Sequence, residues 1–131
     1  MNKFLYGFIV GFFLLSLVFS CQKEEGLGGT NTLKGKLWVK NYSSTGVYLG
    51  EYVGFDERVY LICGSDSFYC NDLRSNYDGG FEFQNLYKGT YSVFAYSKCD
   101  TCTSPEVPVF GTVTFDKNRQ TLDVGQLTLR K

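Results

Sequence analysis

The chain has 131 residues, among them 15 glycines and 2 prolines, and 18% of its residues are aromatic. This composition favours short strands joined by tight turns, so we expect an all-β protein. The histidine count is 0, which excludes Ser-His and Cys-His nucleophiles and removes the commonest zinc ligand. The 13 basic residues balance the 13 acidic ones, so charge gives no reason to expect a nucleic-acid partner.

The amino terminus has the pattern of a signal peptide: Lys3, an apolar run over residues 4–19, and Ser20 before Cys21. The apolar run is shorter than the roughly 20 residues that a transmembrane helix needs. The sequence V-F-S-C resembles the lipobox of bacterial lipoproteins. That resemblance implies cleavage after residue 20 and attachment of acyl chains such as palmitate to Cys21. We therefore predict a lipoprotein signal peptide over residues 1–20.

The residues after Cys21 indicate a cellular location. Residues 22–25, Q-K-E-E, are similar to the export signal of Bacteroidetes lipoproteins, which implies lipid anchoring on the cell-surface side of the outer membrane of a Gram-negative bacterium. A periplasm-facing position is the alternative. Several acyl chains anchor a protein stably without a transmembrane segment. Residues 22–31 are polar and rich in glycine, so we expect Cys21 and a flexible tether over 21–31, followed by one domain over 32–131.

The first half of that domain has two clear strand patterns. Residues 33–42 alternate apolar residues with lysines and place Trp38 on the lysine side. Residues 47–53 suit a short edge strand or an ordered loop. Residues 58–63 form the second strand, with Val59, Leu61 and Cys63 on one face. Five Asp and Asn residues between positions 66 and 78 do not follow the spacing of an EF-hand, so we expect them in turns.

The stretch over residues 77–96 organises the domain. Asp78-Gly79-Gly80 predicts a tight turn, and Phe81 and Phe83 then alternate with polar residues as in a half-buried strand. The spacing L-x-x-G-x-Y, which ends at Tyr91, resembles a tyrosine corner, where the chain passes from one sheet to the other. Beyond it we expect a loop over 97–108, a strand over 109–115, a hairpin turn over 116–119 and a last strand over 121–129 with an irregularity at Gly125.

Together these elements predict a single Greek-key β-sandwich of about seven strands, and they resemble a known group of domains. Transthyretin-like or carboxypeptidase regulatory-like sandwiches share the pattern D-G-x-F-x-F and N-L-x-x-G-x-Y. The matching residues are Asp78, Gly79, Phe81, Phe83, Asn85, Leu86, Gly89 and Tyr91. The resemblance, over residues 35–96, implies a non-catalytic module for structure or partner binding. Hydroxyisourate hydrolases and intradiol dioxygenases have related folds but need histidines.

Four cysteines remain after Cys21, namely Cys63, Cys70, Cys99 and Cys102. An even number in an exported protein favours two disulfides, with three possible connectivities. A zinc site and a redox-active C-x-x-C are the alternatives. The topology of the resembling family sets residues 58–63 antiparallel to 90–97, which implies the local pairs Cys63 with Cys70 and Cys99 with Cys102.

We expect partner binding on aromatic side chains that lie between the two strands and have few aliphatic neighbours: Tyr42, Tyr48, Tyr52 and Phe55. The loop at residues 99–108 is a second choice. The partner would be a protein or a glycan, with no cofactor and no metal. The alternatives are an accessory lipoprotein of an outer-membrane transport complex and, least favoured, an enzyme without histidine that uses Glu51, Asp56 or Glu57.

Overall fold

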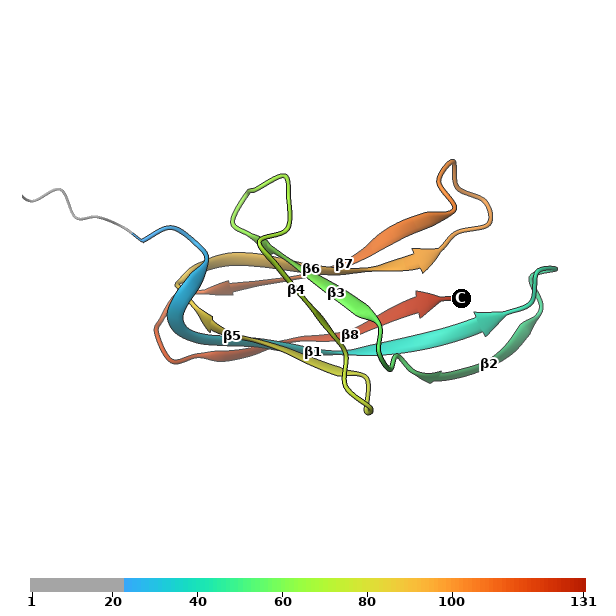
Figure 1. Cartoon of the computed structure of the whole chain (residues 1–131), viewed down its shortest axis with the longest axis horizontal. Helices are drawn as coiled ribbons and strands as arrows, with labels where there is room; N and C mark the ends of the chain where they lie inside the picture. The colour runs from blue at the N-terminus through green and yellow to red at the C-terminus, as the bar shows by residue number, and fades with distance from the viewer. Residues whose placement is uncertain (1–22) are drawn as a thin grey trace, which may run out of the picture.

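The computed structural model describes residues 23–131, which form eight β-strands and no helix. The strands are β1 (Leu27–Tyr42), β2 (Tyr48–Val53), β3 (Arg58–Cys63), β4 (Asn71–Arg74), β5 (Gly80–Leu86), β6 (Gly89–Lys98), β7 (Glu106–Phe115) and β8 (Thr121–Arg130). They pack as two sheets, so the predicted all-β sandwich is confirmed (Figure 1). The predicted signal peptide (1–20) and lipidation site (Cys21) lie outside the described residues. Within 23–131, no helix is long and apolar enough to cross a membrane.

One sheet is built around the long strand β1. β5 pairs with the first half of β1 and β2 with its second half, so these two strands lie end to end along one edge (Figure 1). β8 runs parallel to β1 along the other edge. The other sheet has the order β4-β3-β6-β7, and every pair in it is antiparallel. The chain passes between the two sheets at the connections β2–β3, β4–β5, β5–β6 and β7–β8.

The core consists of the side chains that alternate inward along these strands. Val59, Leu61 and Cys63 are buried, as predicted, and so are Phe81 and Phe83 of β5. Because successive residues of a strand point to opposite faces, the intervening side chains are directed away from the core.

The predicted tyrosine corner is confirmed at the β5–β6 connection. Tyr91 is fully buried, and its hydroxyl donates to the carbonyl oxygen of Tyr87 at 3.0 Å. The same hydroxyl accepts a hydrogen bond of 2.8 Å from the backbone N–H of Gly26. Tyr91 therefore fixes both the corner and the segment that leads into β1.

The first strand begins earlier than predicted. β1 starts at Leu27, so residues 27–31, which were expected in a flexible tether, belong to the sheet. Asn31 is fully buried, and its side-chain oxygen accepts a 2.8 Å hydrogen bond from the backbone N–H of Gln120. Pairing with Leu86 at the end of β5 also orders this segment. These contacts are made by distant parts of the chain. The glycine-rich sequence of the segment itself gives no indication of them.

Two further features differ from the prediction. Residues 71–74 form the edge strand β4, which raises the strand number to eight. Residues 116–119 were expected to form a hairpin turn, but β8 leaves β7 and joins the other sheet beside β1. Leu127 and Leu129 of β8 are buried in the core there, and that burial favours the crossover. The irregularity expected at Gly125 is present, since the β1–β8 register shifts at this point.

Two disulfides join neighbouring positions in the chain. Cys63 is bonded to Cys70 and Cys99 to Cys102. β3 is antiparallel to β6, with Cys63 opposite Tyr91 at the start of β6. Cys63 therefore lies far from Cys99, and the local pairs are those that the family topology implied.

Candidate functional site

The structure separates the four aromatic residues expected to bind a partner. Tyr42 and Tyr48 contact each other edge to face, with ring centroids 5.6 Å apart, where β1 turns into β2. Phe55 lies beyond the other end of β2 and stacks on Tyr77 at 4.8 Å. Tyr52 is exposed between them on an edge strand. Tyr42, Tyr48, Tyr52 and Phe55 therefore do not form one continuous surface.

The second-choice loop, between β6 and β7, is held by polar contacts. Cys99 donates its backbone N–H to the carbonyl oxygen of Pro105 at 2.9 Å. The carboxylate of Asp100 forms a 3.0 Å ion pair with Arg130 and a 3.7 Å ion pair with Lys98. The loop offers no aromatic side chain.

A larger aromatic cluster covers the outer side of the sheet β4-β3-β6-β7. We call it the aromatic face, and it consists of Tyr60, Tyr69, Phe94, Tyr96 and Phe110. The sheet register places Tyr60 directly opposite Phe94, and Phe94 directly opposite Phe110. Their ring centroids lie 4.9 Å and 5.4 Å apart, so the three rings form a continuous row across β3, β6 and β7.

The rings of this row cover one another and not the core. Phe94 is only 8% exposed, although it points away from the buried residues Val93 and Ala95 on the same strand. The rings of Tyr60, Tyr96 and Phe110 pack around it. Tyr96 and Phe110 remain 42% and 54% exposed. Contiguous apolar patches on a protein surface often serve in interactions, so the aromatic face is a candidate binding surface.

Tyr69 borders the aromatic face from the β3–β4 loop. Its ring contacts that of Tyr60 edge to face at 4.9 Å. The neighbouring Cys70 is held by the disulfide to Cys63 and by its backbone N–H, which donates to Leu61 at 2.8 Å. The disulfide therefore fixes the end of the loop from which Tyr69 projects.

A row of hydroxyl groups continues from the aromatic face along β6 and β7. We call it the hydroxyl ladder, and it consists of Thr90, Ser92, Thr112 and Thr114. The hydroxyls of Ser92 and Thr112 lie 3.1 Å apart, and those of Thr90 and Thr114 lie 3.0 Å apart. A hydroxyl has one donor and two acceptor sites, so each pair keeps capacity for a further partner.

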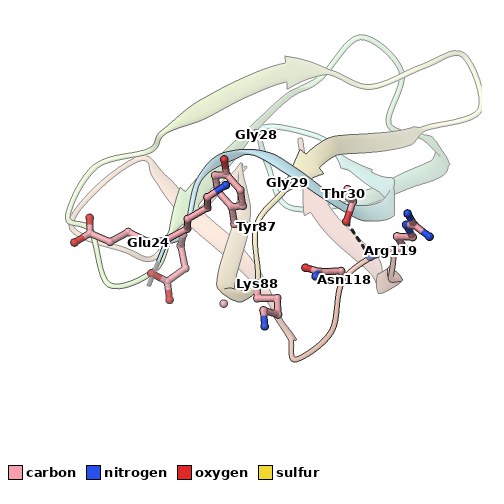
Figure 2. A pocket seen from close by; sticks show the side chains of 11 residues that line it. Glu24, Gly28, Gly29, Thr30, Tyr87, Lys88, Asn118 and Arg119 are labelled. Atoms are coloured by element: carbon pink, nitrogen blue, oxygen red, sulfur yellow. Dashed lines mark hydrogen bonds between the residues drawn. The ribbon is translucent and has the colours of Figure 1, made fainter. Parts of the chain in front are cut away.

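An open hollow of about 1110 Å³ lies at a different place, between residues 23–30, which include the start of β1, and the turns at residues 87–89 and 118–119. Figure 2 shows Tyr87, Lys88, Asn118 and Arg119 around it, with the hydrogen bond from Arg119 N–H to Thr30. Three glycines form part of its wall, and the ammonium group of Lys23 lies 5.0 Å from the centre of the Tyr87 ring. We favour the aromatic face as the binding site, because the hollow presents one ring that a cation already contacts.

Two of the three carboxylates considered for catalysis, Asp56 and Glu57, are engaged in ion pairs. Asp56 pairs with Arg74 at 3.2 Å, and Glu57 pairs with Lys131 at 2.9 Å. In the part of the chain that the structure describes, no group of three or more cysteine and acidic side chains is placed to hold a metal ion. Of the Asx residues expected in turns, Asp78 lies in one and accepts from the N–H of Gly80 at 2.9 Å. The expectation is wrong for Asn71 and Asp72, which lie in the strand β4, where Asp72 pairs with Arg58 at 2.7 Å.

The aromatic face was not predicted from the sequence, although residues that indicate it are present. Tyr60 stands between two inward residues of β3, and Phe94 and Tyr96 stand on the outward positions of β6. Aromatic residues at outward positions of three strands are unusual where polar residues are expected. Combining the alternation with the antiparallel pairing of β3 and β6 would have joined Tyr60 to Phe94.

Comparison with known proteins adds information on the fold. No protein-family model matches the sequence, and no curated protein matches it. Among solved structures, the fold is similar to that of a Pseudomonas aeruginosa protein described as a "putative carbohydrate binding protein", with a TM-score of 0.51 over 79% of this chain and 90% of that one. The two sequences are 17% identical, so the likeness shows a shared all-β fold alone.

Proposed function

We propose that this protein is a non-catalytic binding module that holds glycans on its aromatic face. The observation that carries the proposal is the continuous row of Tyr60, Phe94 and Phe110 on the outer side of a sheet. The Pseudomonas aeruginosa protein of similar fold, described as a putative carbohydrate binding protein, is consistent with this choice.

The chemistry of such a face suits a sugar. One side of a pyranose ring carries mainly C–H groups, which pack against the face of an aromatic ring and remove apolar surface from water. Sugar hydroxyls then need polar partners, and the tyrosine hydroxyls and the hydroxyl ladder lie beside the rings. Tyr96 and Phe110 have the most exposed rings on β6 and β7, so we assign them the direct sugar contacts.

The proposal includes the cellular location. We infer a Bacteroidetes-type lipoprotein of the outer membrane, anchored through acyl chains on Cys21 and displayed at the cell surface, with a transthyretin-like sandwich. Gly26, which Tyr91 fixes to the domain, comes five positions after Cys21, so four residues lie between them. Such a segment reaches at most about 18 Å, so the sandwich would stand close to the membrane.

A glycan array probed with the intact, detergent-solubilised protein tests the binding function. The test variant is Phe110→Ala with Tyr96→Ala, and the matched control is Tyr48→Ala with Tyr52→Ala. The control removes two tyrosines that are similarly exposed, 51% and 48%, and belong to the surface first predicted from sequence. We expect glycan signals from the wild type and the control, and none from the test variant.

Two outcomes would overturn this assignment. Loss of glycan signal only in the control variant would move the site to β2. Absence of any glycan signal from the wild type, combined with specific capture of a protein from outer membranes, would favour a protein partner. Circular dichroism of both variants checks that the sandwich remains folded.

The anchor needs its own test. The Cys21→Ser variant should lose incorporation of labelled palmitate and leave the membrane fraction, whereas protease treatment of intact cells should digest the wild-type domain. Retention of the palmitate label in Cys21→Ser would contradict lipidation at this residue. Protection of the wild-type domain from protease would place it on the periplasmic side.

A further inference from the structure

We propose that the site takes a neutral, extended oligosaccharide of several sugar units, which lies along β6 and β7 from the aromatic face onto the hydroxyl ladder. This inference rests on the proposed glycan binding and specifies its ligand. It follows from the length, the width and the charge of the outward surface of these two strands.

The length of the surface exceeds one sugar ring. Four outward pairs follow one another along β6 and β7: Tyr96 with Pro108, Phe94 with Phe110, Ser92 with Thr112, and Thr90 with Thr114. Neighbouring pairs are two residues apart, which is about 6.8 Å along an antiparallel strand, so the four pairs span about 20 Å. One ring on the aromatic face would leave the hydroxyl ladder empty.

The shape of the surface favours a chain that runs with the strands. The hydroxyl ladder lies on the paired strands β6 and β7, which are about 4.8 Å apart. Beside β6, strand β3 adds the rings of Tyr60 and, from the β3–β4 loop, Tyr69 to the aromatic face. Next to the hydroxyl ladder, β3 presents only the apolar Ile62, opposite Ser92. The outward side chains of β6 and β7, from the pair Tyr96–Pro108 to the pair Thr90–Thr114, form a straight strip. This strip matches a polysaccharide with equatorial linkages, whose chain is extended. It does not match a coiled α-linked glucan.

The charge of the strip selects against acidic sugars. Between the pair Lys98–Glu106 at one end and Gly89–Phe115 at the other, no outward side chain of β6 or β7 carries a charge. Arg58, on the same face of the neighbouring β3, is neutralised by a 2.7 Å ion pair with Asp72. Recognition of carboxylate or sulfate groups depends on Arg or Lys donors. The strip offers hydroxyl groups instead, which donate to and accept from neutral sugar hydroxyls.

The two parts of the strip have different roles in this arrangement. The rings provide the apolar contact that a single sugar or a disaccharide can use. Each hydroxyl pair adds polar contacts that only a longer chain reaches. Because Ser92 and Thr112 orient each other at 3.1 Å, their free donor and acceptor sites are fixed before the ligand binds.

Calorimetric titration of the intact, detergent-solubilised protein tests the inference with two series of probes, β-1,4-linked glucose and β-1,4-linked xylose oligosaccharides of two to six units. Maltohexaose serves as the coiled control. We expect affinity to rise at least tenfold from disaccharide to hexasaccharide in one of the extended series, and to exceed that for maltohexaose. A plateau at the disaccharide, equal binding of maltohexaose, or no binding of either extended series would overturn the inference. Glycan-array binding lost with Phe110→Ala and Tyr96→Ala would still support the proposed function in each of these cases.

A variant separates the hydroxyl ladder from the rings. Thr112→Val with Ser92→Ala removes two hydroxyls and keeps a β-branched side chain at position 112. We expect about tenfold weaker binding of the hexasaccharide and unchanged binding of the disaccharide. The matched control is Thr128→Val, at an exposed threonine of β8 in the other sheet. This control should change the affinity for neither the hexasaccharide nor the disaccharide. An equal loss for both lengths, or no loss, would contradict a role for the hydroxyl ladder.

Discussion

The disulfide between Cys63 and Cys70 should act on glycan binding through Tyr69. Cys63 ends β3, and Cys70 precedes β4, so the bond closes the loop that carries Tyr69 beside the ring of Tyr60. Replacing both cysteines with alanine frees this loop. The control is Cys99→Ala with Cys102→Ala, which opens the loop between β6 and β7.

The two disulfides allow a matched comparison, because their expected effects on stability are similar. The sequence separations are 7 for Cys63–Cys70 and 3 for Cys99–Cys102. The chain-entropy estimate gives a loss in unfolding free energy of about 2 to 2.5 kcal/mol for the first and about 1.5 to 2 kcal/mol for the second. Contact between a sugar and the Tyr69 ring should contribute, like other aromatic contacts, about 0.5 to 1.5 kcal/mol, which corresponds to roughly two- to tenfold in affinity.

A double-mutant cycle measures whether the disulfide acts through Tyr69. Affinity for one array-selected oligosaccharide is measured by calorimetry in the wild type, in Tyr69→Ala, in the Cys63/Cys70 variant and in their combination. We expect each change alone to weaken binding two- to tenfold, and the combination to be no weaker than Tyr69→Ala alone. The Cys99/Cys102 variant should bind as the wild type does.

Additive losses in this cycle would refute the reasoning, because they would mean that the disulfide affects binding by a route other than Tyr69. An equal loss in the Cys99/Cys102 variant would point to general destabilisation. Urea unfolding of each variant gives the accompanying change in stability.

Three further predictions concern the scaffold. Tyr91→Phe should lower the unfolding free energy by about 1 to 3 kcal/mol in urea, because it leaves the N–H of Gly26 and the carbonyl of Tyr87 unpaired; an unchanged midpoint would contradict the role of the tyrosine corner. Burial raises the pKa of the Tyr91 phenol above 10.0, so its contribution is complete below pH 10 and is lost as pH rises through the folded-state pKa. The wild type should thus lose stability above about pH 10 more steeply than Tyr91→Phe. Gly79→Ala should lower the thermal unfolding midpoint of the domain more than Gly46→Ala does. Both glycines have positive φ, but only at Gly79 would a Cβ lie 2.6 Å from a backbone oxygen, that of Leu37. Equal falls in the midpoint for the two variants would contradict this reasoning.

Local sequence was sufficient where neighbouring residues determine the structure. The turn before Phe81, the alternation of Phe81 with Phe83 and the spacing that ends at Tyr91 are all contained in one short stretch. The structure of this stretch depends on local backbone preferences and on the Tyr91 hydroxyl, which donates to the carbonyl oxygen of Tyr87. The strand over residues 58–63 was predictable for the same reason, because its inward side chains alternate.

Contacts between distant residues decided the rest. The turn at 116–119 has hairpin chemistry, yet β8 pairs with β1 because Leu127 and Leu129 complete the core there. β4 has four residues and depends on the edge of β3. The aromatic face joins Tyr60 to Phe94 and Phe110, and each of these residues alone indicates only an outward position. Their adjacency depends on strand order and register, which one sequence does not determine.

The central claim is that sugar binds over the outer side of the sheet β4-β3-β6-β7. Titration of the protein with its array-selected oligosaccharide, followed by aromatic ring NMR signals, tests this claim most directly. We predict that the shifted signals belong to Phe94, Tyr96 and Phe110. Shifts confined to Tyr48, or to Tyr87 beside the hollow, with Phe110 unchanged, would contradict it.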